Sequence, residues 1–530
     1  MASITKQRVG KYTYLYESVS FRDEQGRPRN KKTKIGKLDL ITGEPIYTEE
    51  YLSRVSNDIS SIITVAPDKH PYVEAKGAIA HLLDNVKSFG LYYFLSEIAK
   101  KIGLWDVLQK AIPNCWQEVF TLACHLVASD KPSMYCEDWL SEQDWMPVSS
   151  MSSQRISELF AHLSEADRFA FYRAWCSFIQ DREYIALDMT SISSYSGNIA
   201  DCEWGYNRDK EKLPQINLCM LYGASSRLPV YQTHYSGSLK DVSSLDSTLL
   251  EFKALIGDRP ILTVMDKGFY SAKNINMLLK KEVPFLVSMP FTNNFAKQQV
   301  EHVRNHIDQV SNLIHTSSSP IRGVHRITTW GKEGKQLHVH VFYNPQIALQ
   351  EQNELFELVS KLRNIATKDP NNSSHQKEFK RFLCINTETL DDATQNTVVE
   401  IREDAVAKHL AYAGWFVLIS DYISDAQEAY DIYRMKDGVE KSFWKYKNSL
   451  GLDRLRIHSD RRMLNKTFIA FIALILSSHI DNVLKDKSLY KQYTFNKLMI
   501  TLSTLKSVSI SGQYFLRPLT RVCFQTIQDM

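Results

Sequence analysis

The chain has 530 residues, 44% of them hydrophobic and 23% charged, which is the composition of a folded protein with two to four domains and not of a disordered chain. The net charge of +4, from 64 basic and 60 acidic residues, is too small to identify a polyanionic partner. The first residues lack the apolar core of a signal peptide, and the longest strongly apolar run, residues 468–476, is short of the ~20 residues of a membrane span, so we expect a cytoplasmic protein that does not enter the membrane.

Residues 1–75 are predicted to form a small β-hairpin module. Apolar and polar residues alternate from Tyr12 to Phe21, and a turn over residues 23–26 leads into a second extended segment. That segment carries six basic residues and no acid between positions 27 and 38, namely Arg27, Arg29, Lys31, Lys32, Lys34 and Lys37. These residues fit either an edge strand that lysines keep soluble or a contact with a phosphate backbone.

Residues 76–180 form a helical region, because their apolar residues recur at spacings of three and four. Two of the predicted helices, residues 153–163 and 165–179, are joined by Ser164. They fit a helix-turn-helix reader of DNA, although packed helix pairs are also common. We therefore predict that residues 76–180 are a DNA-binding region.

The next segment, 181–290, has the order strand, strand, strand, helix, strand, helix, strand, which predicts an α/β core. Asp188 stands at the downstream end of an apolar run that begins at Tyr184. Hydroxyl residues follow it, among them Thr190 and Ser191, which are interpreted as turn residues and as residues that support the Asp188 carboxylate. A second near-continuous apolar strand ends at Asp266.

Residues 291–410 break this rhythm with short alternating runs, and we expect a mainly β insertion there. The core resumes over 411–485 with a strand at 414–420 and a helix from Asp425, and 486–530 is a C-terminal segment. On that helix Tyr433, Glu440 and Lys447 are spaced by seven and share nearly one face. Gly438 weakens the helix, so a break is expected near it.

Asp188, Asp266 and Glu440 are candidates for a metal site. Each carboxylate taken alone is more often a turn former or a solvated residue. Together, three hard oxygen ligands from separate elements suit two Mg²⁺ ions that cleave a phosphodiester bond. The eight cysteines lie far apart without a Cys-x-x-Cys pair and are predicted to be reduced, and His338 and His340 make a weak zinc candidate. No Walker-type loop or Gly-x-Ser-x-Gly elbow is present.

The chain resembles bacterial insertion-sequence transposases of the DDE type over roughly residues 80–485. The resemblance rests on segments 187–191, 205–215, 265–271 and 433–447, which include Leu-Asp-Met-Thr-Ser, Met-Asp-Lys-Gly-Phe and the tyrosine, glutamate and lysine of the helix. It implies a ribonuclease-H-like mixed sheet flanked by helices and interrupted by a β-rich insertion, preceded by the hairpin and the helical DNA-binding region.

The resemblance also implies the roles of the site residues. Asp188, Asp266 and Glu440 would bind two Mg²⁺ ions, with Mn²⁺ as a substitute, and Lys447 would contact a phosphate of the transposon end. Tyr433 and Arg434 are expected among the DNA-contacting residues, although they match the tyrosine and arginine of the family pattern only loosely because they are adjacent here. Arg208, Lys210 and Lys212 would face DNA from a basic strand, and Trp330 would either stack on an unpaired base or pack in a small β core.

The function that follows is a DNA transposase that works as a homodimer on double-stranded DNA. It would bind the terminal inverted repeats, hydrolyse the phosphodiester at the transposon end, and join the new 3′ end to target DNA. Two alternatives stay open. One is a nuclease of the same fold without strand transfer, and the other is a degenerate copy that binds DNA without cutting it.

Overall fold

The computed structural model forms two compact units, Met1–Asp84 and Asn85–Met530, whereas the sequence suggested a boundary after residue 75. The residues that the structure describes are 2–10, 12–22, 27–38, 45–48, 50–51, 86–129, 131–179, 184–257, 259, 261–316, 320–331, 334–391, 394–510 and 513–516.

The first unit is an antiparallel sheet with the strand order β1-β2-β3-β4. Its strands are β1 (Ala2–Val9), β2 (Tyr12–Arg22), β3 (Pro28–Leu38) and β4 (Pro45–Tyr47). The β2–β3 pair is the predicted hairpin, and its turn at 23–26 lies outside the described residues. β4 pairs with β3 only over Gly36, Lys37 and Leu38, so the basic residues before Gly36 lie on a stretch of β3 that pairs with β2 alone among the described strands. Lys31, Lys32 and Lys34 are exposed, which is compatible with both roles considered for them.

The second unit begins with a helical region that shares one apolar core with the central sheet. Its main helices are α3 (Gly90–Lys101), α4 (Leu104–Ala111), α5 (Trp116–Ala128), α6 (Cys136–Ser141), α7 (Ser153–His162) and α8 (Glu165–Phe178). α8 buries Trp175, whose indole N–H donates to the carbonyl of Pro229 at 2.9 Å. The predicted helices 153–163 and 165–179 are thus confirmed. They do not form a packed pair, because α8 packs mainly on α4 while α7 packs mainly on the later helix Asp460–Asp486.

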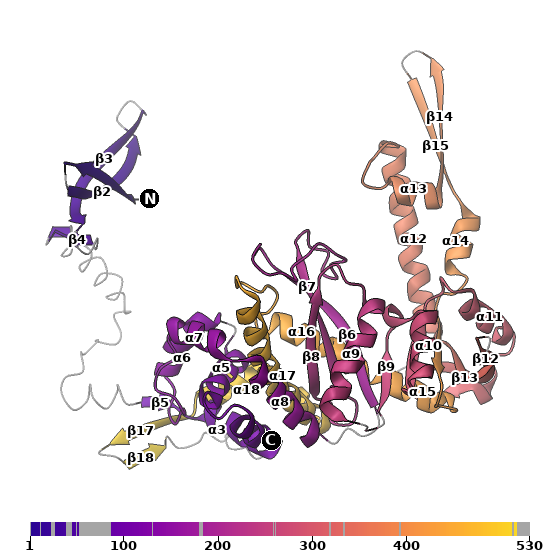
Figure 1. Ribbon diagram of the computed structural model, residues 1–530. Coiled ribbons are helices and arrows are strands. Elements are labelled where there is room, and N and C mark those ends of the chain that lie inside the picture. The colour runs from indigo at the N-terminus through magenta and orange to yellow at the C-terminus, as the bar shows by residue number, and fades with distance from the viewer. Residues whose placement is uncertain are drawn as a thin grey trace. The chain divides into compact units, whose positions relative to one another are not determined.

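The central sheet contains nine strands in the order β11-β12-β13-β16-β10-β9-β6-β7-β8 (Figure 1). They are β6 (Tyr184–Ser193), β7 (Gln215–Gly223), β8 (Pro229–Ser236), β9 (Leu262–Met265), β10 (Phe285–Met289), β11 (Leu313–Ile314), β12 (Ile321–Trp330), β13 (Lys335–Tyr343) and β16 (Trp415–Ser420). β6, β7 and β8 form an antiparallel meander, and β9 and β10 follow in parallel to β6. This arrangement of the first five strands confirms the expected ribonuclease-H-like fold.

Helices cover the sheet and carry the rest of the core. They are α9 (Asp241–Ile256), α10 (Ala272–Lys280), α11 (Asn294–Val303), α15 (Ala426–Arg434), α16 (Asp437–Asn448), α17 (Asp460–Asp486) and α18 (Phe495–Ser503). α16 packs on β6 and β7, and α17 packs on β8 and α5. α17 is long and apolar enough to cross a membrane, but 78% of its apolar window is buried inside the protein, which identifies it as a core helix.

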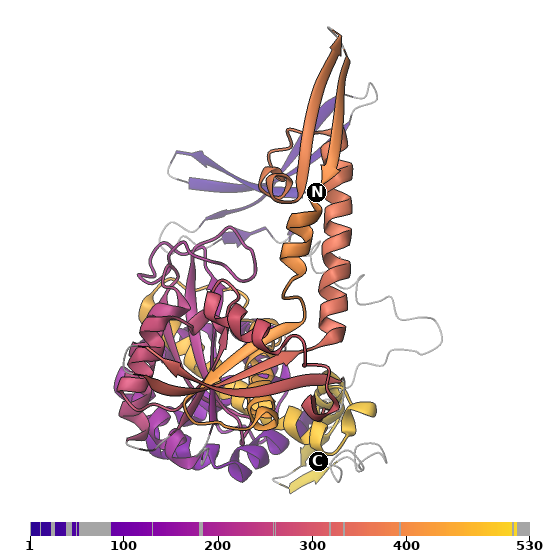
Figure 2. The ribbon, with the colours of Figure 1, turned by 90° about the vertical axis from the view of Figure 1, so that its right-hand side faces the viewer.

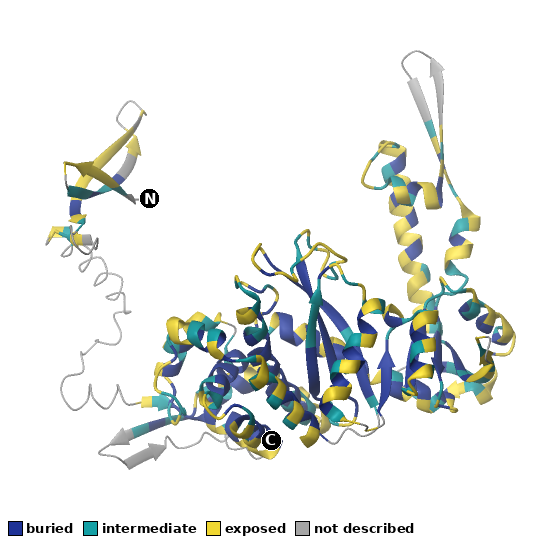
Figure 3. Ribbon diagram, in the orientation of Figure 1, coloured by how far each residue is buried: buried dark blue, intermediate teal, exposed yellow. Residues whose placement is uncertain are grey.

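Residues 291–410, expected as one β-rich insertion, form two different structures. β11, β12 and β13 extend the central sheet, where β13 pairs with β16. The following elements form an arm that projects from the sheet, as Figures 1 and 2 show: α12 (Pro345–Lys368), α13 (Gln376–Phe382), β14 (Leu383–Asp391), β15 (Thr394–Ile401) and α14 (Glu403–Leu410). The arm has a small apolar core of its own and is largely exposed (Figure 3). Alternation along the sequence identified β12 and β13 but not their partners in the sheet, and it did not identify β14 and β15.

The C-terminal segment returns to the beginning of the second unit. β17 (Lys506–Ile510) pairs with β18 (Gln513–Leu516) and with β5 (Val86–Ser88). β17, near the end of the described residues, therefore lies beside the strand that precedes α3.

Candidate active site

Asp188 lies within β6 and not at its end. The strand continues to Ser193, and the backbone N–H of Met189 donates to Asp188 Oδ1 at 2.8 Å. The Asp188 side chain is 15% exposed. The following hydroxyl residues, Thr190 and Ser191, are buried in the same strand, so the interpretation of them as turn residues is wrong. The apolar residues end at Asp188, but the main chain of β6 continues to pair with β7 as far as Ser193.

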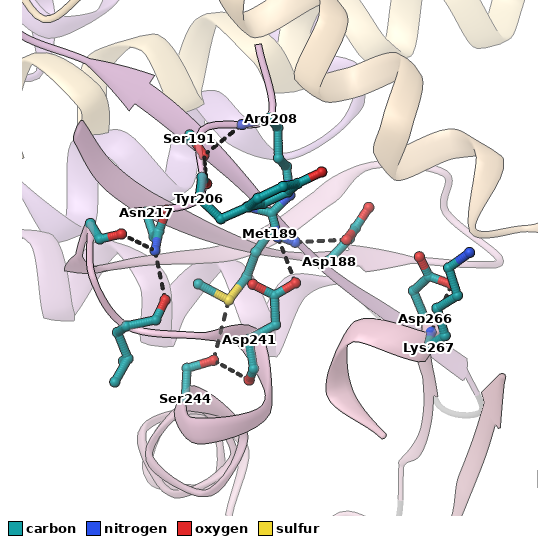
Figure 4. Close-up of polar contacts among 12 residues, drawn as sticks. Asp188, Met189, Ser191, Tyr206, Arg208, Asn217, Asp241, Ser244, Asp266 and Lys267 are labelled. Carbon is teal, nitrogen blue, oxygen red and sulfur yellow. Dashed lines mark hydrogen bonds and ion pairs between the residues drawn. The ribbon is translucent and has the colours of Figure 1, made fainter. Parts of the chain in front are cut away.

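Asp266 stands at the exit of β9, as predicted. Its carboxylate accepts from the backbone N–H of Lys267 at 2.7 Å and caps the short 3₁₀ turn Lys267–Phe269. β6 and β9 are parallel, and Leu187 is the partner of Met265. The two aspartates directly after these partners therefore lie next to each other on adjacent strands (Figure 4).

Glu440 lies in the first turn of α16 and is 60% exposed. The predicted helix from Asp425 is divided into α15 and α16, and the break falls at Met435 and Lys436. Gly438 lies inside α16 against β7, where an added Cβ would come within 2.8 Å of the Tyr222 ring. The glycine therefore permits close packing of the helix on the sheet.

Lys436 joins the three carboxylates. Its Nζ lies 2.7 Å from Glu440 Oε1 and 3.9 Å from both Asp188 Oδ2 and Asp266 Oδ2, and its side chain is 6% exposed. Burial works against the charge, but the carboxylates outweigh it and raise the pKa of Lys436. No pattern in the sequence had pointed to this lysine as a site residue. The available signal was its spacing, three residues after Tyr433 and four before Glu440.

Tyr433 contacts the carboxylate cluster and Arg434 does not. The Tyr433 hydroxyl donates to Asp266 Oδ1 at 3.1 Å. Burial and the neighbouring Asp266 raise its pKa, so it stays a neutral donor. Arg434 instead forms an exposed ion pair with Asp437 at 2.9 Å. Of the two adjacent residues suggested by the family pattern, one faces the carboxylates and the other faces solvent.

Burial dominates the electrostatics of Asp188. It raises the pKa of this carboxyl to about 6, against the opposing effects of Lys436 and of the Met189 N–H. The carboxylate is therefore difficult to keep ionised when the protein is alone, and additional positive charge at the site would favour its ionised form.

The basic residues expected on a strand lie on the loop between β6 and β7. Arg208 pairs with Asp241 at the start of α9, with 2.5 Å between Nη2 and Oδ2 (Figure 4). Lys210 and Lys212 are exposed on the same loop, and the strand placement was wrong for all three residues. Lys210 has a positive φ of 59°, which a regular strand does not contain.

Lys447 lies on α16 two turns after Glu440, as predicted. Its Nζ is 2.6 Å from Oδ2 of Asp209, and its side chain is 10% exposed. The lysine expected to contact phosphate thus has an acidic partner from the β6–β7 loop.

Trp330 and the histidines pack in the sheet. The Trp330 indole donates to Asn276 Oδ1 at 2.8 Å, and its ring meets Phe295 edge to face. Trp330 therefore packs against α10 and α11 and not in the small β core considered for it. His338 Nδ1 lies 2.9 Å from His325 Nε2, and within the described part of the chain no group of three histidine, cysteine or acidic residues is arranged to hold a metal.

The donor set of the three carboxylates nevertheless fits Mg²⁺, which prefers hard oxygen ligands. Their oxygens already converge on one positive charge, the ammonium of Lys436. The arrangement can therefore neutralise a cation with oxygen atoms from β6, from the residue after β9 and from α16.

Comparison with known proteins shows that most of the second unit matches a known protein family. The family model described as "Transposase DDE domain" matches residues 179–476, more than half of the chain. No curated protein matches the chain. A cryo-EM structure of the piggyBac transposase synaptic complex with hairpin DNA is similar at a TM-score of 0.34 and 10% identity, over 86% of this chain and 77% of that one. A similarity this low carries no argument about this protein.

Proposed function

The chain belongs to the DDE transposase family, and from this we propose that it binds the terminal inverted repeats of an insertion sequence, hydrolyses the phosphodiester bond at each end, and joins the new 3′ ends to target DNA. The observation that supports this most directly is the convergence of Asp188, Asp266 and Glu440 on the Lys436 ammonium. Three carboxylates from separate elements are costly to bring together unless positive charge is to be held there.

Asp188, Asp266 and Glu440 would hold two Mg²⁺ ions, with Mn²⁺ as a substitute. When bound, the ions supply charge neutralisation at the scissile phosphate and lower the pKa of an attacking oxygen. The carboxylates differ in mobility, because the two aspartates are anchored by backbone N–H groups while Glu440 is mostly exposed. Glu440 is therefore the ligand that adjusts when the site is loaded.

Tyr433 and Lys436 would position the site. The Tyr433 hydroxyl fixes the orientation of Asp266 through its hydrogen bond. Lys436 keeps the carboxylates together in the free protein, and its buried ammonium would turn to the non-bridging oxygens of the scissile phosphate once the carboxylates carry metal. Preorganised charge of this kind is the main contribution a protein makes to phosphoryl transfer.

DNA would approach along the β6–β7 loop and α16. Lys210 and Lys212 are exposed there, and Lys447 would exchange Asp209 for a phosphate. The exposed lysines of β3 would add contacts to the DNA backbone, and Trp330 is retained as a candidate for stacking on an unpaired base. Because two transposon ends must be joined, we expect a homodimer on DNA in the bacterial cytoplasm.

The test is a cleavage assay with the full chain, Mg²⁺ and DNA that carries the element's terminal repeats. Asp188→Asn, Asp266→Asn and Glu440→Gln should each lower cleavage by at least about a hundredfold. Asp437→Asn removes an acid from the same turn of α16 and should leave cleavage nearly unchanged. Cleavage that survives in all three carboxylate variants would contradict the proposal.

The same reactions distinguish transposition from hydrolysis alone. Products joined to a target plasmid indicate strand transfer, whereas nicked ends without joined products indicate a nuclease of the same fold. DNA binding without either product indicates a degenerate copy.

A further inference from the structure

A pocket with a volume of about 450 Å³ lies between the helical region and the segments that follow α16. It is bordered by the end of α5, the 3₁₀ turn Ser133–Tyr135, one face of α7, the segment 450–457 and the start of α17. It shares no residue with the carboxylate site. Its volume is within the range of small-molecule sites in proteins, roughly 300–1,000 Å³.

The charge of this pocket is entirely positive. Its described lining includes no acidic residue and four basic ones, Lys131, Arg456, Arg462 and Lys466. Asp453 lies 3.4 Å from Arg456, but both side chains are about half exposed, and such surface pairs offset little charge. The four basic residues therefore line one cavity, Lys466 partly buried in it and the other three exposed to solvent.

Lys466 is the most deeply placed of the four. Its Nζ donates to the carbonyl of Leu455 at 2.8 Å. Burial lowers the pKa of Lys466 to about 8, repulsion from Arg456 adds to this, and Asp453 offsets a part. An anion in the pocket would relieve both the repulsion and the cost of burying the ammonium.

The remaining lining supplies a helix terminus and an apolar wall. α7 begins at Ser153 beside the pocket, with Ser152 as its N-cap, so the positive end of its dipole adds to the field. Ile156 and Phe160 follow one turn apart on the same helix face, and Ile457 lines the pocket too. The pocket thus combines an anion-binding rim with a surface for a flat apolar group.

We propose that this pocket binds a phosphate-bearing nucleotide, with its phosphate among Lys131, Arg456, Arg462 and Lys466 and its base against the apolar wall of α7. An inorganic anion would leave the wall uncovered, and an uncharged apolar molecule would not neutralise the partly buried ammonium of Lys466. A nucleotide supplies both parts. It is either an unpaired nucleotide of bound DNA or a free mononucleotide, and the inference does not depend on catalysis at the carboxylates.

The test measures binding of three probes to the full chain by calorimetry or fluorescence anisotropy. The probes are inorganic phosphate, thymidine 5′-monophosphate, and a DNA duplex with a short unpaired end. Arg462→Gln removes a cation that lines the pocket, and Arg461→Gln, one residue earlier on α17 and outside the lining, is its matched control. Ser157→Glu adds a negative charge to the wall, and Gln154→Glu adds the same charge on α7 outside the lining.

Arg462→Gln and Ser157→Glu should weaken nucleotide binding by about tenfold or more, while both controls stay within about twofold of the wild type. If the pocket variants lose affinity for the mononucleotide alone, the ligand is a free nucleotide. If they lose affinity for the DNA end alone, the ligand is an unpaired nucleotide of DNA. Both outcomes support the site.

The proposal is overturned if the wild type binds none of the probes, if the controls lose as much affinity as the pocket variants, or if phosphate binds as tightly as the nucleotide. Thermal melting of each variant establishes that it is folded. Asp188→Asn protein should bind the nucleotide like the wild type, so failure of the catalytic proposal and failure of this one give different results.

Discussion

The Lys436 ammonium lies 2.7 Å from Glu440 Oε1, one helical turn further along the chain, and lies 3.9 Å from both Asp188 and Asp266. This lysine balances the charge of the carboxylates when no other cation does so. Replacement of Lys436 by a neutral residue should therefore lower the stability of the metal-free protein and increase the stabilisation that a bound metal ion gives.

Lys436→Gln is expected to destabilise the metal-free protein by on the order of 2 kcal/mol, because it leaves three carboxylates close together without a counter-charge. Mg²⁺ should then raise the melting temperature of the variant more than that of the wild type, since the ion takes over the charge. Differential scanning calorimetry with and without EDTA measures this. Lys441→Gln, exposed on the same helix, is the control, and an equal Mg²⁺ response in both variants contradicts the prediction.

The buried Asp188 predicts a pH dependence of stability. Because its pKa is raised to about 6 in the folded protein, the folded state retains a proton that the unfolded state releases. Stability from this group is therefore present below about pH 4 and is lost as the pH rises to about 6. Asp188→Asn should stabilise the metal-free protein at pH 8 by roughly 1–3 kcal/mol.

At pH 4 the same variant should differ little from the wild type, because the carboxyl is then protonated in both states. Asp431→Asn, on the exposed face of α15, supplies the comparison. Urea unfolding at both pH values measures the effect. If Asp188→Asn is less stable than the wild type at pH 8, the attraction between Asp188 and Lys436 outweighs the cost of burying the charged carboxylate, and the prediction is wrong.

Tyr433→Phe removes the hydrogen bond to Asp266 without changing the packing of the ring. We expect a loss of about 1 kcal/mol in stability and a decrease of about tenfold in the cleavage rate, because Asp266 is no longer held in one orientation. The Mg²⁺ concentration for half-maximal cleavage should rise as well, which a defect in folding alone does not produce. Tyr430→Phe on the same helix is the control.

The ion pair between Lys447 and Asp209 predicts two variants with opposite effects on DNA affinity. Asp209→Asn frees Lys447 and removes a negative charge, so binding should strengthen by roughly three- to tenfold at low salt. Lys447→Gln should weaken it by a similar factor. Fluorescence anisotropy with terminal-repeat DNA measures both, and Asp404→Asn in the arm controls for net charge. Weaker binding by Asp209→Asn would mean that the pair holds the loop in place for DNA.

The lysines of β3 are tested by the salt dependence of DNA binding. Removal of one lysine–phosphate interaction should lower the slope of log K against log salt by about 0.9. Neutralising Lys31, Lys32 and Lys34 together should therefore lower it by nearly three units if all three bind phosphates of the DNA. The triple variant of Lys100, Lys101 and Lys110, which are exposed on α3 and α4, is the control. An unchanged slope would favour the role of these lysines in keeping an edge strand soluble.

The sequence alone identified several local features of the protein. The apolar runs that became β6 and β9, the carboxylates that end or follow them, and the shared face of Glu440 and Lys447 all depend on residues close together in the chain. Their side-chain periods of two and 3.6 residues are set by backbone geometry, so they can be read before the fold is known.

The tertiary structure decided which of these features meet. The parallel register of β6 and β9 brought Asp188 beside Asp266, and the break before α16 directed Lys436 into the site while Arg434 faced solvent. β12 and β13 joined the central sheet, and Arg208 lay on a loop. Pairing between strands and the direction of a side chain at a helix break depend on contacts between distant residues, and no local pattern encodes them.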